Sequence, residues 1–154
     1  MYKYKKIEGA GHPLFLFRTL TGSEYKVSFT NYDVLENIQI QMISVDCENS
    51  RVKDILTGET INDLIQNYLS ENPNVILAYV CDSEDERAAH RQRKFLGWYQ
   101  LYAKESRYSL RAYHVPVIEL DLTYYTALIY DAEVYSSEFM DKFYKTQIKN
   151  YVEK

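Results

Sequence analysis

The chain has few of the residues that build disulfide frameworks, zinc sites or phosphate loops. Its 154 residues include two cysteines, three histidines and five glycines. No Cys-x-x-Cys or His-x-x-x-His spacing occurs, so we expect no zinc site and no other metal centre. Five glycines leave little room for a glycine-rich phosphate loop, and none is present. Cys47 and Cys81 lie in apolar, strand-like runs, which predicts buried thiols and no disulfide.

Long apolar runs and an excess of positive charge are also missing. No run approaches the roughly 18 apolar residues of a membrane-spanning helix. The first eleven residues carry charge but lead into no apolar signal-peptide core. We therefore expect a cytoplasmic protein without a membrane partner. The net charge of −4 argues against a general nucleic-acid-coating protein, which is usually strongly basic, but it is compatible with a local basic patch.

Tyrosine is the abundant residue, with 16 copies. Its ring packs well on half-buried sheet faces while its hydroxyl keeps a polar partner, so we interpret most of these residues as sheet and core. An interaction surface is the second interpretation. A chain of this length can bury a sizeable core, and we predict a single α+β domain over residues 1–154.

Hydrophobic periodicity predicts the element order β-β-β-α-β-α-β-β-α. This order indicates an α+β fold with a mostly antiparallel or mixed sheet of about six strands and three helices. Strands are expected at residues 14–20, 24–30, 38–47, 75–81, 108–114 and 123–130. Helices are expected from Thr57 or Thr60 to residue 71, over residues 84–104, and after Ser136 or Ser137. Residues 1–11 have the pattern of a frayed lead-in or an edge strand.

Residues 72–102 contain the most information in the chain. Positions 75–81 are apolar throughout, which predicts a central strand covered on both faces. Ser83 and Glu86 then form a capping box at the start of the next helix. Within that helix, a basic stripe repeats at i, i+4, i+7 and i+11. The stripe consists of Arg87, Arg91, Lys94 and Trp98.

The run from Asn72 to Ser83, NPNVILAYVCDS, is followed by Asp85, Arg87, Arg91, Phe95 and Trp98. This pattern resembles a family of small bacterial proteins of unknown function. The similarity covers most of the chain and is best over residues 72–99. Members of that family often have glycine where this chain has Glu86. The resemblance implies the same fold and carries no activity with it.

The corner after the central strand allows two interpretations. In the functional one, two aspartates hold a divalent cation and two arginines grip a phosphate group. In the structural one, the same residues cap the helix and form ion pairs. Trp98 either stacks on a base or closes the edge of the core. The candidate ligand-binding residues are Asp82, Ser83, Asp85, Arg87, Arg91, Lys94 and Trp98.

These observations favour a non-enzymatic protein-interaction or regulatory module, without catalytic residues and without a cofactor. Its partner would be another protein or a second copy of the chain. The alternative is a nucleic-acid or nucleotide (phosphate) binding protein, including a small metal-dependent nuclease, that uses the basic helix over residues 84–104. The ion pairing of the basic stripe discriminates between the two functions. If all its arginines are held in ion pairs, the nucleic-acid or nucleotide binding hypothesis loses its basis.

Overall fold

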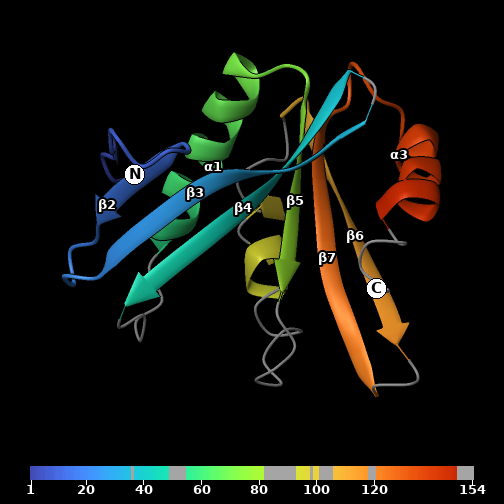
Figure 1. Ribbon diagram of the computed structural model, residues 1–154. Helices are drawn as coiled ribbons and strands as arrows, with labels where there is room; N and C mark the ends of the chain where they lie inside the picture. The colour runs from blue at the N-terminus through green and yellow to red at the C-terminus, as the bar shows by residue number, and fades with distance from the viewer. Residues whose placement is uncertain are drawn as a thin grey trace. The chain divides into compact units, whose positions relative to one another are not determined.

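The structure is a computed structural model, and it describes residues 1–35, 37–48, 55–81, 93–97, 99–100, 106–117 and 121–148 (Figure 1). Its described strands number seven and are hydrogen-bonded in the order β1-β2-β3-β4-β5-β7-β6. The predicted α+β class is confirmed, with seven strands where about six were expected. The chain divides within β5 into two compact units, residues 1–77 (unit 1) and 78–154 (unit 2), and each is described by itself.

Unit 1 contains an antiparallel meander, as predicted for residues 13–47. Its strands are β1 (Lys5–Lys6), β2 (Leu14–Arg18), β3 (Glu24–Leu35) and β4 (Ile38–Glu48). The turn after β2 closes with the Thr19 N–H donating to the Ser23 carbonyl at 2.9 Å. Gly22 adopts φ +87° in this turn, a conformation that residues with a Cβ rarely adopt. The additional strand is β1. It lies in residues 1–11, which the sequence pattern allowed to be either a frayed lead-in or an edge strand.

One face of the meander is apolar because its register aligns the large side chains. Phe17 lies opposite Tyr25, and Phe15 lies opposite Val27. Side chains alternate along a strand, so these four residues point to the same face. Phe29 shares this face, and its ring stacks on a ring of helix α1 (Ile55–Glu71) with centroids 3.8 Å apart. Helix α1 therefore covers the apolar face of the meander.

Helix α1 begins earlier than the sequence indicated. It starts at Ile55, so the prediction that Thr57 or Thr60 caps it was wrong. Both threonines are buried within the helix. The Thr60 hydroxyl donates to the Leu56 carbonyl at 2.6 Å and accepts from the Tyr2 N–H at 2.8 Å. Both threonines pack inside the unit, and Thr60 also anchors the N-terminal segment. Short-range sequence signals do not reveal such roles.

Strand β5 (Val75–Cys81) crosses the boundary between the units. Val75, Ile76, Leu77 and Ala78 are all buried, as expected for a strand covered on both faces, and Tyr79 is half-buried. In unit 2, residues 93–97 and 99–100 are helical, and they belong to the helix predicted over residues 84–104. The remainder of that helix, including its proposed capping box, lies outside the described residues.

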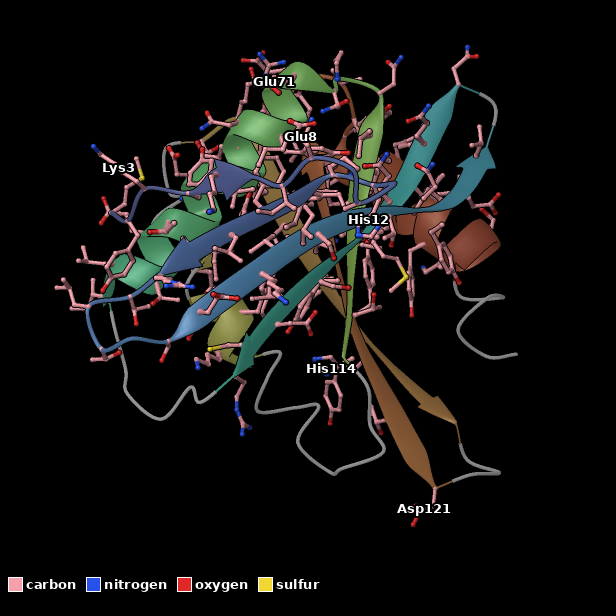
Figure 2. All side chains as sticks on the ribbon, turned by 60° about the vertical axis from the view of Figure 1, so that its left-hand side comes forward. Lys3, Glu8, His12, Glu71, His114 and Asp121 are labelled. Atoms are coloured by element: carbon pink, nitrogen blue, oxygen red, sulfur yellow. The ribbon has the colours of Figure 1, made fainter. Side chains whose placement is uncertain are left out.

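Strands β6 (Tyr108–Val117) and β7 (Leu122–Asp131) form an antiparallel hairpin in unit 2. Asp121 stands at its tip with φ +50° (Figure 2). The hairpin is longer than predicted, because β6 continues through Pro116. The Ala132 N–H donates to the Arg107 carbonyl, and hydrogen-bonded positions alternate along such a ladder. The Pro116 nitrogen therefore points away from β7, and its missing N–H removes no ladder bond.

Helix α3 (Ser137–Phe143) follows β7 and continues into the π-helical turn η2 (Tyr144–Ile148) (Figure 1). The N-cap was predicted to be Ser136 or Ser137, and it is Ser136. Its hydroxyl accepts from the Phe139 N–H at 3.0 Å. Met140 and Phe143 are buried, as predicted for the apolar stripe. Phe139 was expected in the same stripe, but its side chain is exposed.

Candidate functional site

Most of the predicted ligand-binding residues lie outside the part of the chain that the structure describes. Asp82, Ser83, Asp85, Arg87, Arg91 and Trp98 belong to this group. Lys94 lies in the helical residues 93–97 and is exposed. The binding site at the end of β5 therefore stays a prediction. Among the described residues, no three His, Cys, Asp or Glu side chains gather closely enough to hold a metal ion.

His114 and several tyrosines of the described residues have packing roles. His12 and His114 lie on different units, and His114 contacts the ring of Tyr125 across the hairpin (Figure 2). The Tyr68 hydroxyl donates to the Gln41 side chain, which in turn donates to Asn31. Six tyrosines of the described residues are buried, in agreement with a core role for these six. They are Tyr25, Tyr68, Tyr99, Tyr108, Tyr130 and Tyr144.

The surface of unit 2 that stands out is a short run of exposed apolar side chains beside α3. Val134 is 56% exposed and Phe139 is 40% exposed. Tyr135 stacks on Phe139 at 5.3 Å between centroids, and Phe139 stacks on buried Phe143 at 5.8 Å. We refer to Val134, Tyr135 and Phe139 as the α3 ridge. The ridge is thus connected through its rings to the core of the unit.

The turn that carries the α3 ridge is held by one buried carboxylate. Asp131 is 6% exposed and accepts two hydrogen bonds from the Arg107 guanidinium, of which the Nε–Oδ1 bond measures 3.1 Å. Its Oδ1 also accepts from the Glu133 N–H at 2.9 Å. Its backbone carbonyl accepts from the N–H groups of Val134 and Tyr135 at 3.1 and 2.9 Å. The backbone N–H groups of residues 132–135 are therefore all held, either by Asp131 or by the Arg107 carbonyl at the end of the hairpin.

The charge on Asp131 is maintained inside the unit. Burial opposes its ionisation, but the hydrogen bonds from Arg107 and from the Glu133 N–H, together with the Arg107 charge, outweigh burial. The pKa of Asp131 is therefore lower than that of an ordinary aspartate. An ionised carboxylate accepts stronger hydrogen bonds than a neutral one, which strengthens the turn.

A second polar group fastens α3 to the hairpin. One Arg111 nitrogen of β6 donates to both Asp141 oxygens of α3, at 2.7 and 2.6 Å. The Tyr113 hydroxyl donates to the same carboxylate at 3.1 Å, and its ring stacks on Tyr144 at 3.8 Å. Burial and the neighbouring Asp141 charge raise the pKa of Tyr113 to about 12. The hydrogen bond from Arg111 is the main reason that the pKa of Asp141 is lowered.

Sequence reasoning missed the α3 ridge for an identifiable reason. Periodicity groups Phe139 with Met140 and Phe143, but it does not measure how wide a stripe the rest of the unit can cover. A usable signal was the pair Val134 and Tyr135 in the short turn before the helix, close in sequence to Phe139, because neighbouring exposed apolar residues can form a patch.

The fold and this surface define a mixed α+β protein that presents a fixed apolar turn beside its last helix. No helix among the described residues has the length and apolar character needed to cross a membrane. The chain belongs to the family of unknown function DUF6169, whose model matches residues 53–145, more than half of its length. This range includes α1, β5, the hairpin of unit 2 and all of α3. No curated protein and no solved structure matches the chain.

Proposed function

We propose that this protein is a non-enzymatic protein-interaction module that holds its partner on the α3 ridge. The observation that carries the proposal is the exposure of Val134, on a turn fixed by Asp131, and of Phe139, in the first part of α3. Aromatic side chains provide much of the binding energy at protein interfaces. A surface that is already rigid loses little conformational entropy when a partner binds, which favours affinity.

Charge around the α3 ridge points to the chemistry of the partner. Glu133 and Glu138 flank the ridge and are exposed. A partner segment with an apolar anchor and nearby lysine or arginine would complement these carboxylates. A second copy of the chain fits less well, because two ridges that meet would also bring together the acidic flanks of two chains that each carry a net charge of −4. The proposed occupant is therefore a basic, amphipathic segment of another protein.

Peptide selection tests this function without a known partner. We would select a random peptide display library on the full-length protein, then measure the dissociation constants of the selected peptides by fluorescence anisotropy. We expect an apolar anchor beside Lys or Arg, and we expect Phe139→Ser to weaken binding about tenfold or more, which is typical of a central aromatic contact.

The control is Val34→Ser, which removes an even more exposed apolar side chain from unit 1. This variant should bind the selected peptides as the wild type does. Equal loss of affinity in both variants, or selected peptides that carry acidic flanks, would contradict the proposal. The predicted nucleotide or nucleic-acid site at residues 82–98 receives no further support from the described residues.

A further inference from the structure

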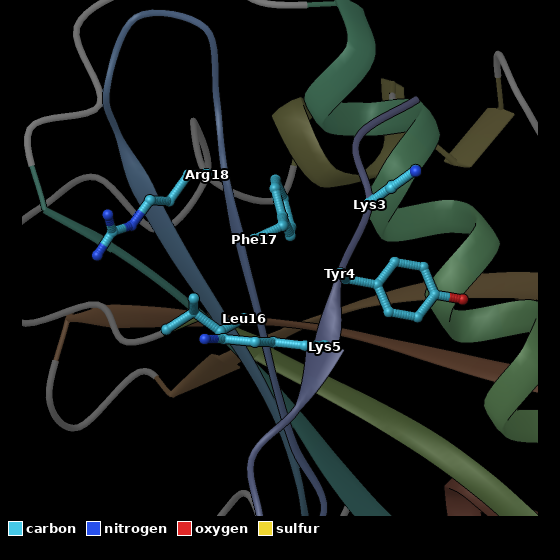
Figure 3. Close-up of a pocket in the computed structure, with 6 residues that line it drawn as sticks. All are labelled: Lys3, Tyr4, Lys5, Leu16, Phe17 and Arg18. Atoms are coloured by element: carbon cyan, nitrogen blue, oxygen red, sulfur yellow. The ribbon is translucent and has the colours of Figure 1, made fainter.

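A second surface, on unit 1, has the features of an anion site. A cavity of about 420 Å³ opens where the N-terminal segment separates from β2 (Figure 3). Three of its six lining residues are cationic, and a leucine, a phenylalanine and a tyrosine form the rest. The lining residues are Lys3, Tyr4, Lys5, Leu16, Phe17 and Arg18. We refer to this cavity as the basic hollow.

The basic hollow exists because α1 pulls the N-terminal segment away from β2. The ladder between β1 and β2 ends at the pair Lys5–Leu16. Beyond it, the Tyr2 N–H donates to Thr60 of α1, and the Tyr4 hydroxyl donates to Asp63 of α1 at 3.0 Å. Asn67 of α1 donates to the same hydroxyl at 2.7 Å. The opening is thus held by specific contacts.

The separation leaves a backbone donor directed into the basic hollow. The Ile7 N–H donates to the Leu14 carbonyl, so Leu14 faces β1. Alternation along the strand makes Arg18 face the same side. Its natural partner would be Lys3, but no backbone hydrogen bond joins these two residues in the described structure. Cations beside a backbone N–H without a backbone partner can bind an anion through charge-assisted hydrogen bonds.

The side chains of the basic hollow are available for a ligand. Lys3 and Lys5 have no ion-pair partner among the described residues, and both are exposed. Arg18 pairs with Glu24 at 3.0 Å, but this pair lies on the surface, where such contacts contribute little to stability and can be exchanged. Figure 3 shows Lys5 and Arg18 on the β2 side, with Lys3 directed to the other side. The long flexible stems allow both amines to close over a ligand.

We propose that the basic hollow binds a small phosphate-bearing anion, such as pyrophosphate or the diphosphate of a nucleotide. Its volume lies within the usual range of small-molecule sites. Acidic residues on the same face limit the ligand to a compact one, because Glu24 lies beside Arg18, and Asp46 lies opposite Lys26 in the ladder. A long polyanion such as RNA would cross these carboxylates and be repelled.

Titration with two probes tests the site. Sodium pyrophosphate and ADP are added separately to the ¹⁵N-labelled full-length protein, and amide shifts are followed by NMR. We expect saturable binding with a shift at the Arg18 N–H. The double variant Lys3→Ala/Lys5→Ala should raise the dissociation constant about tenfold or more, since it removes two charge-assisted contacts. Tighter binding of ADP would identify a nucleotide as the ligand, and equal binding would identify the diphosphate group alone.

The control is the double variant Lys6→Ala/Lys26→Ala, which removes the same charge from residues that do not line the basic hollow. It should bind both probes as the wild type does, and the melting temperatures of the two variants should agree. The proposal is overturned if neither probe binds, if both double variants lose affinity equally, or if only a single-stranded oligonucleotide binds.

Discussion

Asp131 is a charged residue that holds several parts of unit 2 together. It connects Arg107, the end of β7 and the turn of the α3 ridge. Because its pKa is lowered in the folded protein, its stabilising effect is complete above the ordinary aspartate pKa of about 3.9. The effect is lost as the pH falls through the lowered value, where the folded carboxylate also takes up a proton.

We therefore predict a pH-dependent cost for Asp131→Asn. The variant should lower the free energy of unfolding by about 1–3 kcal/mol near pH 6, because a charged and partly buried hydrogen-bond acceptor becomes neutral. The difference from wild type should shrink as the pH falls below the ordinary aspartate pKa of about 3.9 and on through the lowered value. Urea unfolding at several pH values measures both.

Glu133→Gln serves as the control for this prediction. Glu133 contacts the same guanidinium at 3.4 Å but is exposed, and such surface pairs contribute about 0–1 kcal/mol. A cost for Asp131→Asn that stays constant at every pH would show that the carboxylate charge does not hold the turn.

The stability of α3 depends mainly on its first turn. Its regular part spans only seven residues before the π-helical turn η2 begins. A helix this short gains little from its own hydrogen bonds, so its cap and its contacts with β6 decide its stability. Ser136 provides the cap, while the neighbouring Ser137 is the first helical residue.

The two adjacent serines give a matched pair of variants. Ser136→Ala should lower the free energy of unfolding by about 1 kcal/mol, because the Phe139 N–H loses its acceptor. Ser137→Ala should leave it nearly unchanged, or raise it slightly through helix propensity. Chemical denaturation of both variants measures the difference, and equal costs would place the cap elsewhere.

The sequence predicted which strands and helices exist more reliably than where they end or which of their side chains are exposed. Strand-like patterns located the meander and an unbroken apolar run located β5, because alternation and burial can be read directly from those residues. The start of α1 was misplaced, since Thr57 and Thr60 have the chemistry of caps but are used in packing. The exposure of Phe139 depends on which neighbours the fold supplies. The basic hollow depends on where α1 anchors Tyr2, a contact of residues 58 apart in the chain.

At the scale of the whole molecule, two units share one strand. The division falls inside β5, and the family match begins at residue 53 and so includes α1 but not β1 to β4. We propose that the chain behaves as the single domain expected from its length, because opening of either unit would expose part of β5. Hydrogen exchange reports whether the two parts open together or separately.

Phe29→Ala tests this coupling. Phe29 is fully buried in unit 1, and its truncation should lower the free energy of unfolding by about 3–5 kcal/mol. For a single domain, hydrogen exchange should then accelerate in both units alike. Leu20→Ala is the control, because Leu20 is almost fully exposed. Acceleration confined to residues 1–77 would show that the units open independently.

Pro116 has a consequence beyond the shape of its hairpin. Strand β6 is the last in the sheet order, and the outer edge of a sheet can recruit strands from other molecules. A recruited strand would need an unbroken row of outward N–H donors, and Pro116 interrupts that row. Pro116 thus removes one of the N–H donors that a recruited strand would pair with, which disfavours edge-to-edge growth of the sheet.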